Sequence, residues 1–393
     1  MAQQSPTARE VTLASHSWLQ NQLQPFLADL ETMVNMDSGS YDREDVEKVA
    51  RWLKDRVAAW HATVHTHDGA PRADSFAVEL QGTGSAKIAL LAHLDTVFSS
   101  GTASERPFRV VGDKATGPGV SDMKAGVLGA VYAIEALRTQ GFEHFHWIRL
   151  VCTTDEEIGS GNSKEFIERM SSGADAVFVL EGGRENGDIV SQRKGVGSYQ
   201  LQVRGKPAHA GVEPWKGSSA ILALARQTVA LHELNDYARG ATVNVGVVRG
   251  GTRSNVVAEH ASAEIDVRAN TQDDMEDLLK RMVQALDDAL LPGTSYTFSP
   301  RQSRPAWGPS SGTARLAHMA GEIAHLLGFD VRAVATGGGS DGNFTAATGI
   351  PTLDGLGPVG GLDHGPDEYA VVSSIIPRTA LLAGLIAHVS LGE

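Results

Sequence analysis

The sequence predicts an α/β protein whose sheet is connected by crossover helices, with a small ferredoxin-like α+β domain inserted into it. The chain has 393 residues, which is too long for one ordinary domain and indicates two. Through residue 180, short apolar runs alternate with segments of helical periodicity. The order then changes to strand, helix, strand, strand, helix, strand, which is the split β-α-β-β-α-β unit. Residues 1–190 and 303–393 are therefore predicted to form one discontinuous domain around a lid at 191–302.

The elements of the first segment follow from apolar spacing and from turn residues. Val46, Val49 and Leu53 recur at the interval of one buried helix face. The strands are short apolar runs bounded by glycine or polar residues. The predicted helices cover 17–35, 46–60, 127–137 and 164–170, and the predicted strands cover 75–80, 87–93, 147–153 and 174–180. Such an alternation predicts a sheet with crossover helices.

The inserted domain and the last segment are predicted in the same way. In the insertion we expect strands at 198–204, 241–249, 256–268 and 296–300, and helices at 218–234 and 273–290. The alternation then resumes with a helix at 313–327, a strand at 331–336 and a helix at 375–389. The open sheet edge or helix face of the inserted unit suits it to pair two subunits as well as to serve as a lid.

Composition excludes several classes of partner. The net charge of −13 and the pI of about 5.5 would repel a phosphate backbone, so no nucleic-acid partner is expected. The first ten residues hold no apolar signal core, and no run approaches the ~20 apolar residues of a membrane span, so no membrane partner is expected. We expect a cytoplasmic protein, although a removed signal would leave no trace. The single cysteine, Cys152, excludes intrachain disulfides.

One apolar strand ends in two metal-ligating side chains. Residues 88–92 are apolar, and they are followed by His93 and, two residues later, Asp95. In a strand these two side chains point to the same side, so one could bind a metal while the other orients a ring by a hydrogen bond. A His and an Asp that are merely solvated at the end of a strand are the alternative.

Other candidate ligands are placed in a similar way along the chain. The further candidates are Asp122, Glu156, Glu157, Glu181 and His364, and most of the acidic ones follow apolar runs. The ends of parallel strands converge in one crevice, so these side chains are expected to meet. Glu156 and Glu157 are neighbours whose side chains diverge, so one should bind metal and the other should face the substrate. A solvated acidic loop is the alternative for this pair.

The ordered motifs resemble those of the co-catalytic zinc peptidases of family M20, and within it most of all the glutamate carboxypeptidases. The likeness covers nearly the whole chain and includes the inserted domain. It rests on Ala92-His-Leu-Asp-Thr-Val, Gly117-Pro-Gly-Val-Ser-Asp-Met-Lys-Ala-Gly, Thr154-Asp-Glu-Glu-Ile-Gly-Ser, Glu181, Gly205-Lys-Pro-Ala-His-Ala-Gly, Gly337-Gly-Gly-Ser-Asp-Gly-Asn and Asp363-His-Gly. The resemblance implies a zinc-peptidase catalytic domain with a central mixed sheet flanked by helices.

The resemblance also implies a site with two Zn²⁺ ions per subunit, with Co²⁺ or Mn²⁺ as alternatives. His93 and Glu181 would bind one ion, and Glu157 and His364 would bind the other. Asp122 would bridge the two. Each ion then has mixed nitrogen and oxygen ligands with an open position, as a catalytic zinc site requires.

The implied activity is that of a metallopeptidase that removes a carboxyl-terminal amino acid by attack of a metal-bound hydroxide. Glu156 would be the general base, and Asp95 would orient His93. An N-acyl amino acid deacylase and a dipeptidase are the alternatives within the family. The expected partners are a small peptide or N-acyl amino acid substrate and a second subunit in a homodimer.

Four residues are expected to bind the substrate. The resemblance makes His209 the residue that polarises the scissile carbonyl from the lid of a partner subunit, with Asn255 as a neutral donor to the oxyanion. Arg268 and Arg304 are candidates for a bidentate grip on the substrate carboxylate, because a guanidinium matches two carboxylate oxygens. The alternative interpretation is that these residues are ordinary solvated side chains with no contact to a substrate.

Two alternatives lie outside this mechanism. Gly338-Gly-Ser-Asp-Gly fits the nucleophile elbow of serine hydrolases, with Asp363 and His364 downstream in the right order. Too little chain remains after Ser340 for the strands and helices that such a fold places before its histidine. The second alternative is a binding protein on the same fold that has lost its chemistry, and the complete ligand set with Glu156 speaks against it.

Overall fold

The computed structural model describes residues 6–393, and its chain divides into two compact units. Unit 1 comprises the chain through Gln192 together with Pro309–Ala335 and Phe344–Glu393, and unit 2 comprises Arg193–Gly308 and Thr336–Asn343. The first boundary lies within two residues of the predicted one, but the other differs. Residues 303–308 belong to unit 2 because the main chains of Trp307 and Arg193 exchange two hydrogen bonds, of 3.0 and 3.1 Å.

Segment 336–343 is a second correction to the predicted boundaries. It was expected in the catalytic domain, but it belongs to unit 2. Arg304 bonds Asp341 at 2.9 Å, and Arg193 donates to the carbonyl oxygen of Gly338 at 3.2 Å. These contacts join residues far apart in sequence, so the local pattern carried no sign of them.

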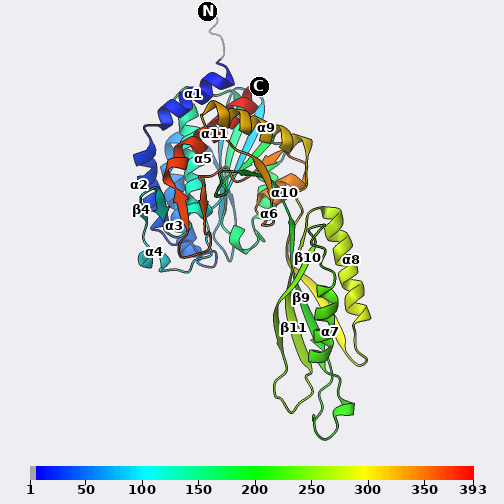
Figure 1. Ribbon diagram of the computed structural model, residues 1–393. Coiled ribbons are helices and arrows are strands. Elements are labelled where there is room, and N and C mark those ends of the chain that lie inside the picture. Colours follow the sequence, from blue (N-terminus) through cyan, green and yellow to red (C-terminus); the bar gives the residue numbers. More distant parts are fainter. Residues whose placement is uncertain (1–5) are drawn as a thin grey trace, which may run out of the picture. The chain divides into compact units, whose positions relative to one another are not determined.

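Unit 1 is built on a six-stranded mixed sheet, in the order β1-β2-β6-β3-β7-β14 (Figure 1). The strands are β1 Thr63–His67, β2 Ser75–Gln81, β3 Ala86–His93, β6 Phe145–Thr153, β7 Ala176–Val179 and β14 Thr352–Leu353. The pairs β3–β6, β3–β7 and β7–β14 are parallel, whereas β1–β2 and β2–β6 are antiparallel. This confirms the predicted α/β fold with a central mixed sheet.

Helices cover both faces of this sheet. Successive side chains of β3 point to opposite faces, and those on each face join a different hydrophobic core. Ile88 and Leu90 join the larger core with α5 and α11, whereas Ala89 and Leu91 join a smaller core with α6. The helices with residues in unit 1 are α1 Ala8–Leu19, α2 Leu23–Val34, α3 Arg43–Arg56, α4 Thr102–Glu105, α5 Ala125–Arg138, α6 Lys164–Ser171, α9 Ser311–Leu326, α10 Gly342–Ala347 and α11 Val372–Leu391. Burial on both faces explains why β3 is almost continuously apolar.

The helix expected at 17–35 is in fact two helices, α1 and α2. Pro25 lies in the first turn of α2, where its missing N–H costs nothing, but its ring would clash inside a continuous helix. The first helix begins earlier than expected, at Ala8. It is capped by Thr7, whose hydroxyl oxygen accepts from the main-chain N–H of Glu10 and whose own main-chain N–H donates to the Glu10 carboxylate.

Helix α11 is the one helix in residues 6–393 whose length and composition would suffice to cross a membrane. The mean hydropathy of its most apolar stretch is 1.5, although Pro377, Arg378 and His388 interrupt the apolar residues, as the expected absence of a run of this length requires. Of that stretch of the helix, 67% is buried inside unit 1, where Ile375, Leu381 and Leu385 belong to the main core. A helix that is apolar on most of its faces packs in this way at the centre of a large core.

Unit 1 also contains a small four-stranded sheet. Its order is β15-β16-β5-β4, and its strands are β4 Arg109–Val111, β5 Lys114–Thr116, β15 Gly360–Gly361 and β16 Tyr369–Val371. A two-stranded pairing joins β8 Ile189–Arg193 to β13 Ala333–Thr336. These strands are too short for an alternation to be visible in the sequence, and only β13 was expected.

Unit 2 has the predicted β-α-β-β-α-β order. Its strands are β9 Gly195–Arg204, β10 Thr242–Gly250, β11 His260–Ala269 and β12 Ser295–Arg304, and its helices are α7 Ala220–His232 and α8 Gln272–Asp288. The antiparallel sheet runs β10-β11-β9-β12, and both helices pack on one of its faces (Figure 1). The strand expected from residue 256 begins only at His260, because 252–259 form a loop.

Candidate metal centre

Three parallel strands of unit 1 end at the same edge of the sheet. His93 ends β3 and lies opposite Thr153, which ends β6, and Leu91 lies opposite Val179, which ends β7. Glu156 and Glu157 follow β6 within four residues, and Glu181 follows β7 within two. The carboxyl ends of parallel strands are where open α/β sheets keep their sites. The structure therefore brings three separate segments to one edge.

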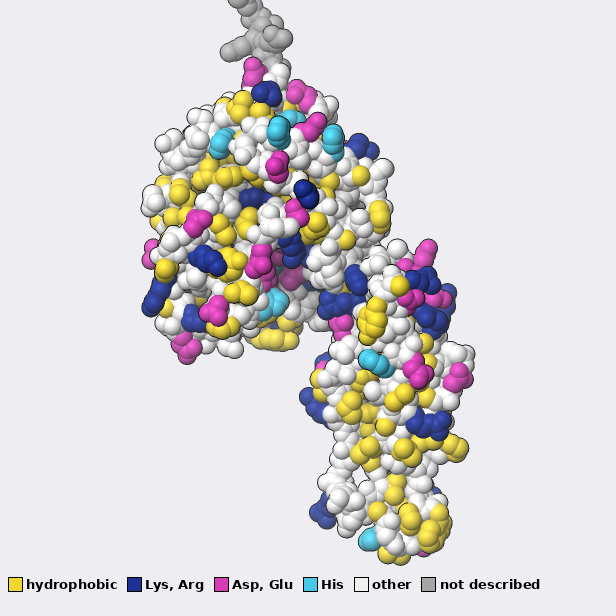
Figure 2. Space-filling view, viewed as in Figure 1, with side chains coloured by type: hydrophobic (Ala, Val, Ile, Leu, Met, Phe, Trp, Pro, Cys, Tyr) yellow, Lys and Arg dark blue, Asp and Glu magenta, His cyan; other side chains and the backbone are white. Residues whose placement is uncertain are grey.

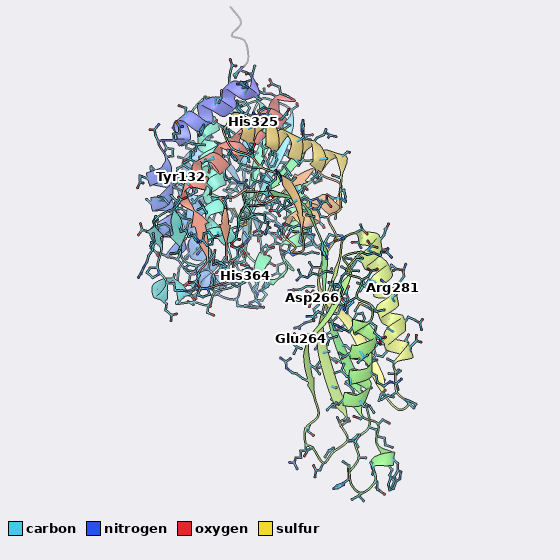
Figure 3. The ribbon with its side chains drawn as sticks, viewed as in Figure 1. Tyr132, Glu264, Asp266, Arg281, His325 and His364 are labelled. Carbon is cyan, nitrogen blue, oxygen red and sulfur yellow. The ribbon has the colours of Figure 1, made fainter. Side chains whose placement is uncertain are left out.

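Asp122 lies between two histidines. Its Oδ1 is 3.0 Å from Nε2 of the buried His93, and its Oδ2 is 3.1 Å from Nε2 of His364. His364 comes from the loop that precedes β16, and it is labelled on unit 1 in Figure 3. One carboxylate thus offers a different oxygen to each imidazole, which is the arrangement of a bridging ligand.

The three glutamates complete the cluster. Glu157 Oε2 lies 3.1 Å from His364 Nε2, and Glu181 Oε1 lies 3.8 Å from His93 Nε2. Glu156 has a carboxylate oxygen within 4.8 Å of ligand atoms of both His93 and Glu181. Figure 2 shows acidic side chains gathered beside a histidine on the visible face of unit 1. Both neighbouring glutamates lie near His93, but Glu156 groups with Glu181 and Glu157 with Asp122 and His364.

The electrostatics of this cluster fit a pair of divalent cations. Burial and the charge of Asp122 raise the pKa of Glu181 well above its usual range, and the same causes raise that of Glu157. Bonds to Asp122 and Glu157 raise the pKa of His364 to about 11. Buried carboxylates packed together ionise only with difficulty unless cations neutralise them, and mixed imidazole and carboxylate donors suit zinc. The donor set therefore fits the metals implied by the sequence.

Asp95 contacts His93, as the predicted orienting role requires, and it makes further bonds that the sequence did not indicate. His93 Nδ1 lies 2.9 Å from the main-chain oxygen of Asp95 and 3.6 Å from its carboxylate, so the closer contact is to the backbone. The fully buried carboxylate accepts from the main-chain N–H groups of Glu156 and Glu157, both at 3.2 Å, and from Ser40 at 2.7 Å. Asp95 therefore fixes the loop of the two glutamates as well as the imidazole.

Two residues of this region gave no sign in the sequence. Glu368 is 1% exposed and accepts three main-chain hydrogen bonds from the Gly119–Asp122 turn, and burial raises its pKa to about 7 against those bonds. Lys124 is buried and donates to the carbonyl oxygens of Met36 and Pro118. Burial lowers the pKa of Lys124 to about 8. Each side chain pairs with backbone far away in the sequence or within a turn, which no periodicity reveals.

His209 and Asn255 lie on two exposed loops of unit 2 that pair with each other through a bridge between His209 and Val256. The Nδ1 atom of His209 accepts from the main-chain N–H groups of Gly211 and Val212, at 3.1 and 3.2 Å. Because Nδ1 is an acceptor, a neutral His209 carries its proton on Nε2. The main-chain oxygen of Asn255 accepts from Ala210 at 3.0 Å. The loop thus presents a histidine with one defined N–H donor.

The two candidate arginines have different surroundings within unit 2. Arg268 donates to the carboxylate of Asp266 at 2.9 Å and to the carbonyl oxygen of Gly337 at 2.8 Å. Arg304 is 8% exposed and bonds Asp341 at 2.9 Å. A Cβ on Gly339 would lie 2.8 Å from Arg304 Cδ, so glycine is needed there for close approach. Both guanidiniums are oriented by carboxylates, and their contact with a substrate stays a prediction.

The geometry speaks against the serine-hydrolase alternative. Ser340 is fully buried and its hydroxyl accepts from the main-chain N–H of Gly342, whereas an elbow serine must be exposed. His364 faces Asp122 and Glu157 instead of a serine. The chemistry that this site can perform is therefore hydrolysis with carboxylate and imidazole groups around cations.

Comparison with known proteins gives one family. The model of peptidase family M20/M25/M40 matches residues 89–388. Carboxypeptidase G2 of Pseudomonas sp. (strain RS-16) is 28% identical over 93% of this chain and 89% of its own length. Succinyl-diaminopimelate desuccinylase of Thioalkalivibrio sulfidiphilus is 27% identical over 69% of this chain and 74% of its own.

Solved structures share the fold. The aminopeptidase PepT from Bacillus cereus superposes with a TM-score of 0.79 at 24% identity, covering 93% of this chain and 98% of that one. Relatives of one fold thus carry names of a carboxypeptidase, a desuccinylase and an aminopeptidase.

Proposed function

The chain belongs to peptidase family M20/M25/M40, which makes it a peptide or amide hydrolase, and on that premise we propose that it is a two-zinc carboxypeptidase that acts on small peptides or N-acyl amino acids. The observation that carries the proposal is the carboxylate of Asp122, whose two oxygens each lie within 3.1 Å of a different histidine. His93 and Glu181 would hold one ion, and Glu157 and His364 the other.

The side chains of the site have separate tasks in this reaction. The bound ions would supply Lewis-acid activation of the water and of the scissile carbonyl. Glu156 takes the proton of the attacking water and returns it to the leaving amine. Asp95 holds the main chain at Glu156, and so fixes where that carboxylate lies. The Nε2–H group of His209 donates a hydrogen bond to the carbonyl oxygen, which becomes negative as the tetrahedral species forms.

The specificity is tested by a hydrolysis screen. Compounds with an N-acyl or N-benzoyl group on glutamate, dipeptides, and N-succinyl or N-acetyl amino acids are incubated with and without added Zn²⁺. We expect the largest kcat/KM on amides of a carboxyl-terminal amino acid. A preference for short aliphatic acyl groups would favour the deacylase alternative, for which the similarity to a desuccinylase speaks.

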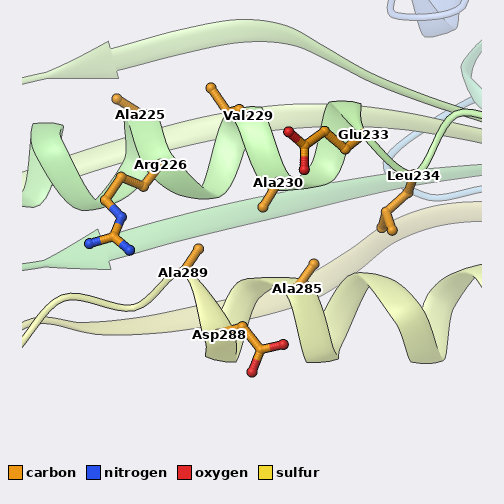
Figure 4. Close-up of a pocket in the computed structure, with 9 residues that line it drawn as sticks. All are labelled: Ala225, Arg226, Val229, Ala230, Glu233, Leu234, Ala285, Asp288 and Ala289. Carbon is orange, nitrogen blue, oxygen red and sulfur yellow. The ribbon is translucent and has the colours of Figure 1, made fainter.

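We propose further that the protein is a homodimer paired through unit 2. The outer face of α7 exposes Leu222 (56%) and Val229 (60%), and a groove of about 790 Å³ between α7 and α8 is lined by four alanines, Val229 and Leu234, with Arg226, Glu233 and Asp288 among them (Figure 4). Exposed apolar side chains bordered by charged ones are typical of a protein interface. A second copy of the chain suits it, because isologous pairing presents the same face twice.

Mixing two inactive variants tests whether His209 acts in the site of the partner. A dimer of one His209→Ala and one Glu156→Gln subunit carries one site in which both residues are intact if His209 acts in trans. After random subunit exchange at equal amounts we expect about a quarter of wild-type kcat, because half of the dimers are mixed and each has one working site. No recovery, with exchange verified by a mass tag, would place His209 in its own subunit's site.

Replacing Arg304 with lysine tests the proposed grip on the substrate carboxylate. The change keeps the charge and removes the planar fork. On a substrate with a free terminal carboxylate, kcat/KM should therefore fall by an amount that corresponds to a loss of about 1–3 kcal/mol of transition-state stabilisation. Arg301→Lys, on the same strand and half exposed, is the control and should change little. Equal losses on a substrate with an amidated carboxyl terminus would assign Arg304 to the support of Asp341 alone.

A further inference from the structure

Glu368 binds the turn that carries Asp122. Its Oε1 accepts from the main-chain N–H groups of Ser121 at 2.8 Å and Asp122 at 3.0 Å, and its Oε2 accepts from Gly119 at 3.0 Å. The residue is 1% exposed. A carboxylate so enclosed and so fully bonded within the protein is not placed to contact a substrate, and its bonds all converge on one turn.

That turn does not hold its shape by itself. Residues Val120–Lys124 precede α5, but Asp122 and Met123 leave helical geometry, with φ of −114° and −131°. Main-chain N–H groups ahead of a helix have no partners within it. Gly119 has a φ of +72°, and a Cβ there would lie 2.5 Å from Thr96 Cγ2, so the turn is tightly confined as well. The Glu368 carboxylate supplies acceptors for three of these N–H groups.

The small sheet brings Glu368 to this position. Glu368 directly precedes β16, which pairs with β5, and β5 leads within three residues into Gly119. His364 lies four residues earlier in the same loop and contacts the side chain of Asp122. One segment therefore holds Asp122 twice, through its carboxylate by His364 and through its main-chain N–H by Glu368.

We propose that Glu368 is a positioning residue of the metal centre, which fixes the main chain of Asp122 so that its two carboxylate oxygens face His93 and His364. The inference rests on the proposed two-metal site. Because Asp122 faces both halves of that site, loss of Glu368 should weaken the binding of both ions, unlike the loss of His364. Partners that orient a ligand are worth about 10–100-fold in metal affinity.

The test is a Zn²⁺ titration of the chelator-stripped full-length protein against a chromophoric chelator. Glu368→Gln keeps the size of the side chain but presents an N–H₂ group where an acceptor is needed, and Glu368→Asp keeps the charge and shortens the reach. Asp367→Asn removes an exposed carboxylate from the adjacent position and is the matched control. Thermal unfolding of each metal-free variant reports the fold separately.

We expect Glu368→Gln to bind both ions about 10–100-fold more weakly, Glu368→Asp to recover part of the loss, and Asp367→Asn to match wild type. Wild-type affinity for both ions in a folded Glu368→Gln protein would overturn the inference. Failure of both Glu368 variants to fold would overturn it as well, because Glu368 would then determine the fold. If the wild-type protein itself bound no Zn²⁺, the proposed function would fail instead.

Discussion

Replacing Glu156 with glutamine is expected to leave both ions bound and to lower kcat by roughly 10²–10⁴-fold, the usual value of general base catalysis. Glutamine has nearly the same shape but cannot take a proton from the attacking water. Glu156 lies near His93 and Glu181, and it is not needed as a ligand in the proposed set. The measurements are metal content and kcat on the best substrate of the screen.

The adjacent glutamate is the contrast for this prediction. Glu157 lies 3.1 Å from His364, with which it would hold one ion, so Glu157→Gln should release mainly that ion. Turnover near the wild-type value in Glu156→Gln would exclude Glu156 as the base. Loss of metal from Glu156→Gln but not from Glu157→Gln would mean that the two assignments must be exchanged.

Replacing Asp122 with alanine is expected to release both ions and to abolish hydrolysis. Its two oxygens lie 3.0 and 3.1 Å from the two histidines, so no other single side chain among the proposed ligands faces both halves of the site as closely. His364→Ala should release mainly one ion, because His93 and Glu181 remain together. Elemental analysis of dialysed protein measures both outcomes.

Two full equivalents of metal in Asp122→Ala would remove Asp122 from the bridging position. Loss of both ions from His364→Ala as well would show that the two halves of the site cannot be occupied separately. Circular dichroism of the metal-free proteins distinguishes either outcome from unfolding.

The parts of the structure that depend on local pattern could be predicted from the sequence. The alternation of apolar runs and helical periodicity predicts the sheet with crossover helices in unit 1 and the β-α-β-β-α-β order of unit 2, and the resemblance to the family adds that the sheet is mixed. The polar residues that follow β3, β6 and β7 meet at one edge because these strands are parallel. The resemblance to the family motifs, and not the local pattern, then set the proposed metal ligands apart from ordinary solvated acids.

What could not be predicted depends on contacts between distant residues. Trp307 and Arg193 bond across more than a hundred residues, which moves the unit boundary without changing any local period. Glu368 has the sequence setting of a solvated acid, yet it is buried against a turn near residue 120. Asp95 was predicted to orient His93, but the sequence does not show which atom makes the contact: the carbonyl oxygen of Asp95 lies 2.9 Å from His93 Nδ1 and its carboxylate 3.6 Å.

The central claim, that two metal ions and Glu156 make this chain an amide hydrolase, is tested most directly by restoring metal to stripped protein. Zn²⁺ is added stepwise to the chelator-treated enzyme while hydrolysis of an N-acyl glutamate is followed. We predict no hydrolysis without metal and recovery that is complete at two equivalents per chain. Full hydrolysis in the presence of chelator, or two bound equivalents with no hydrolysis of any compound in the screen, would contradict the claim.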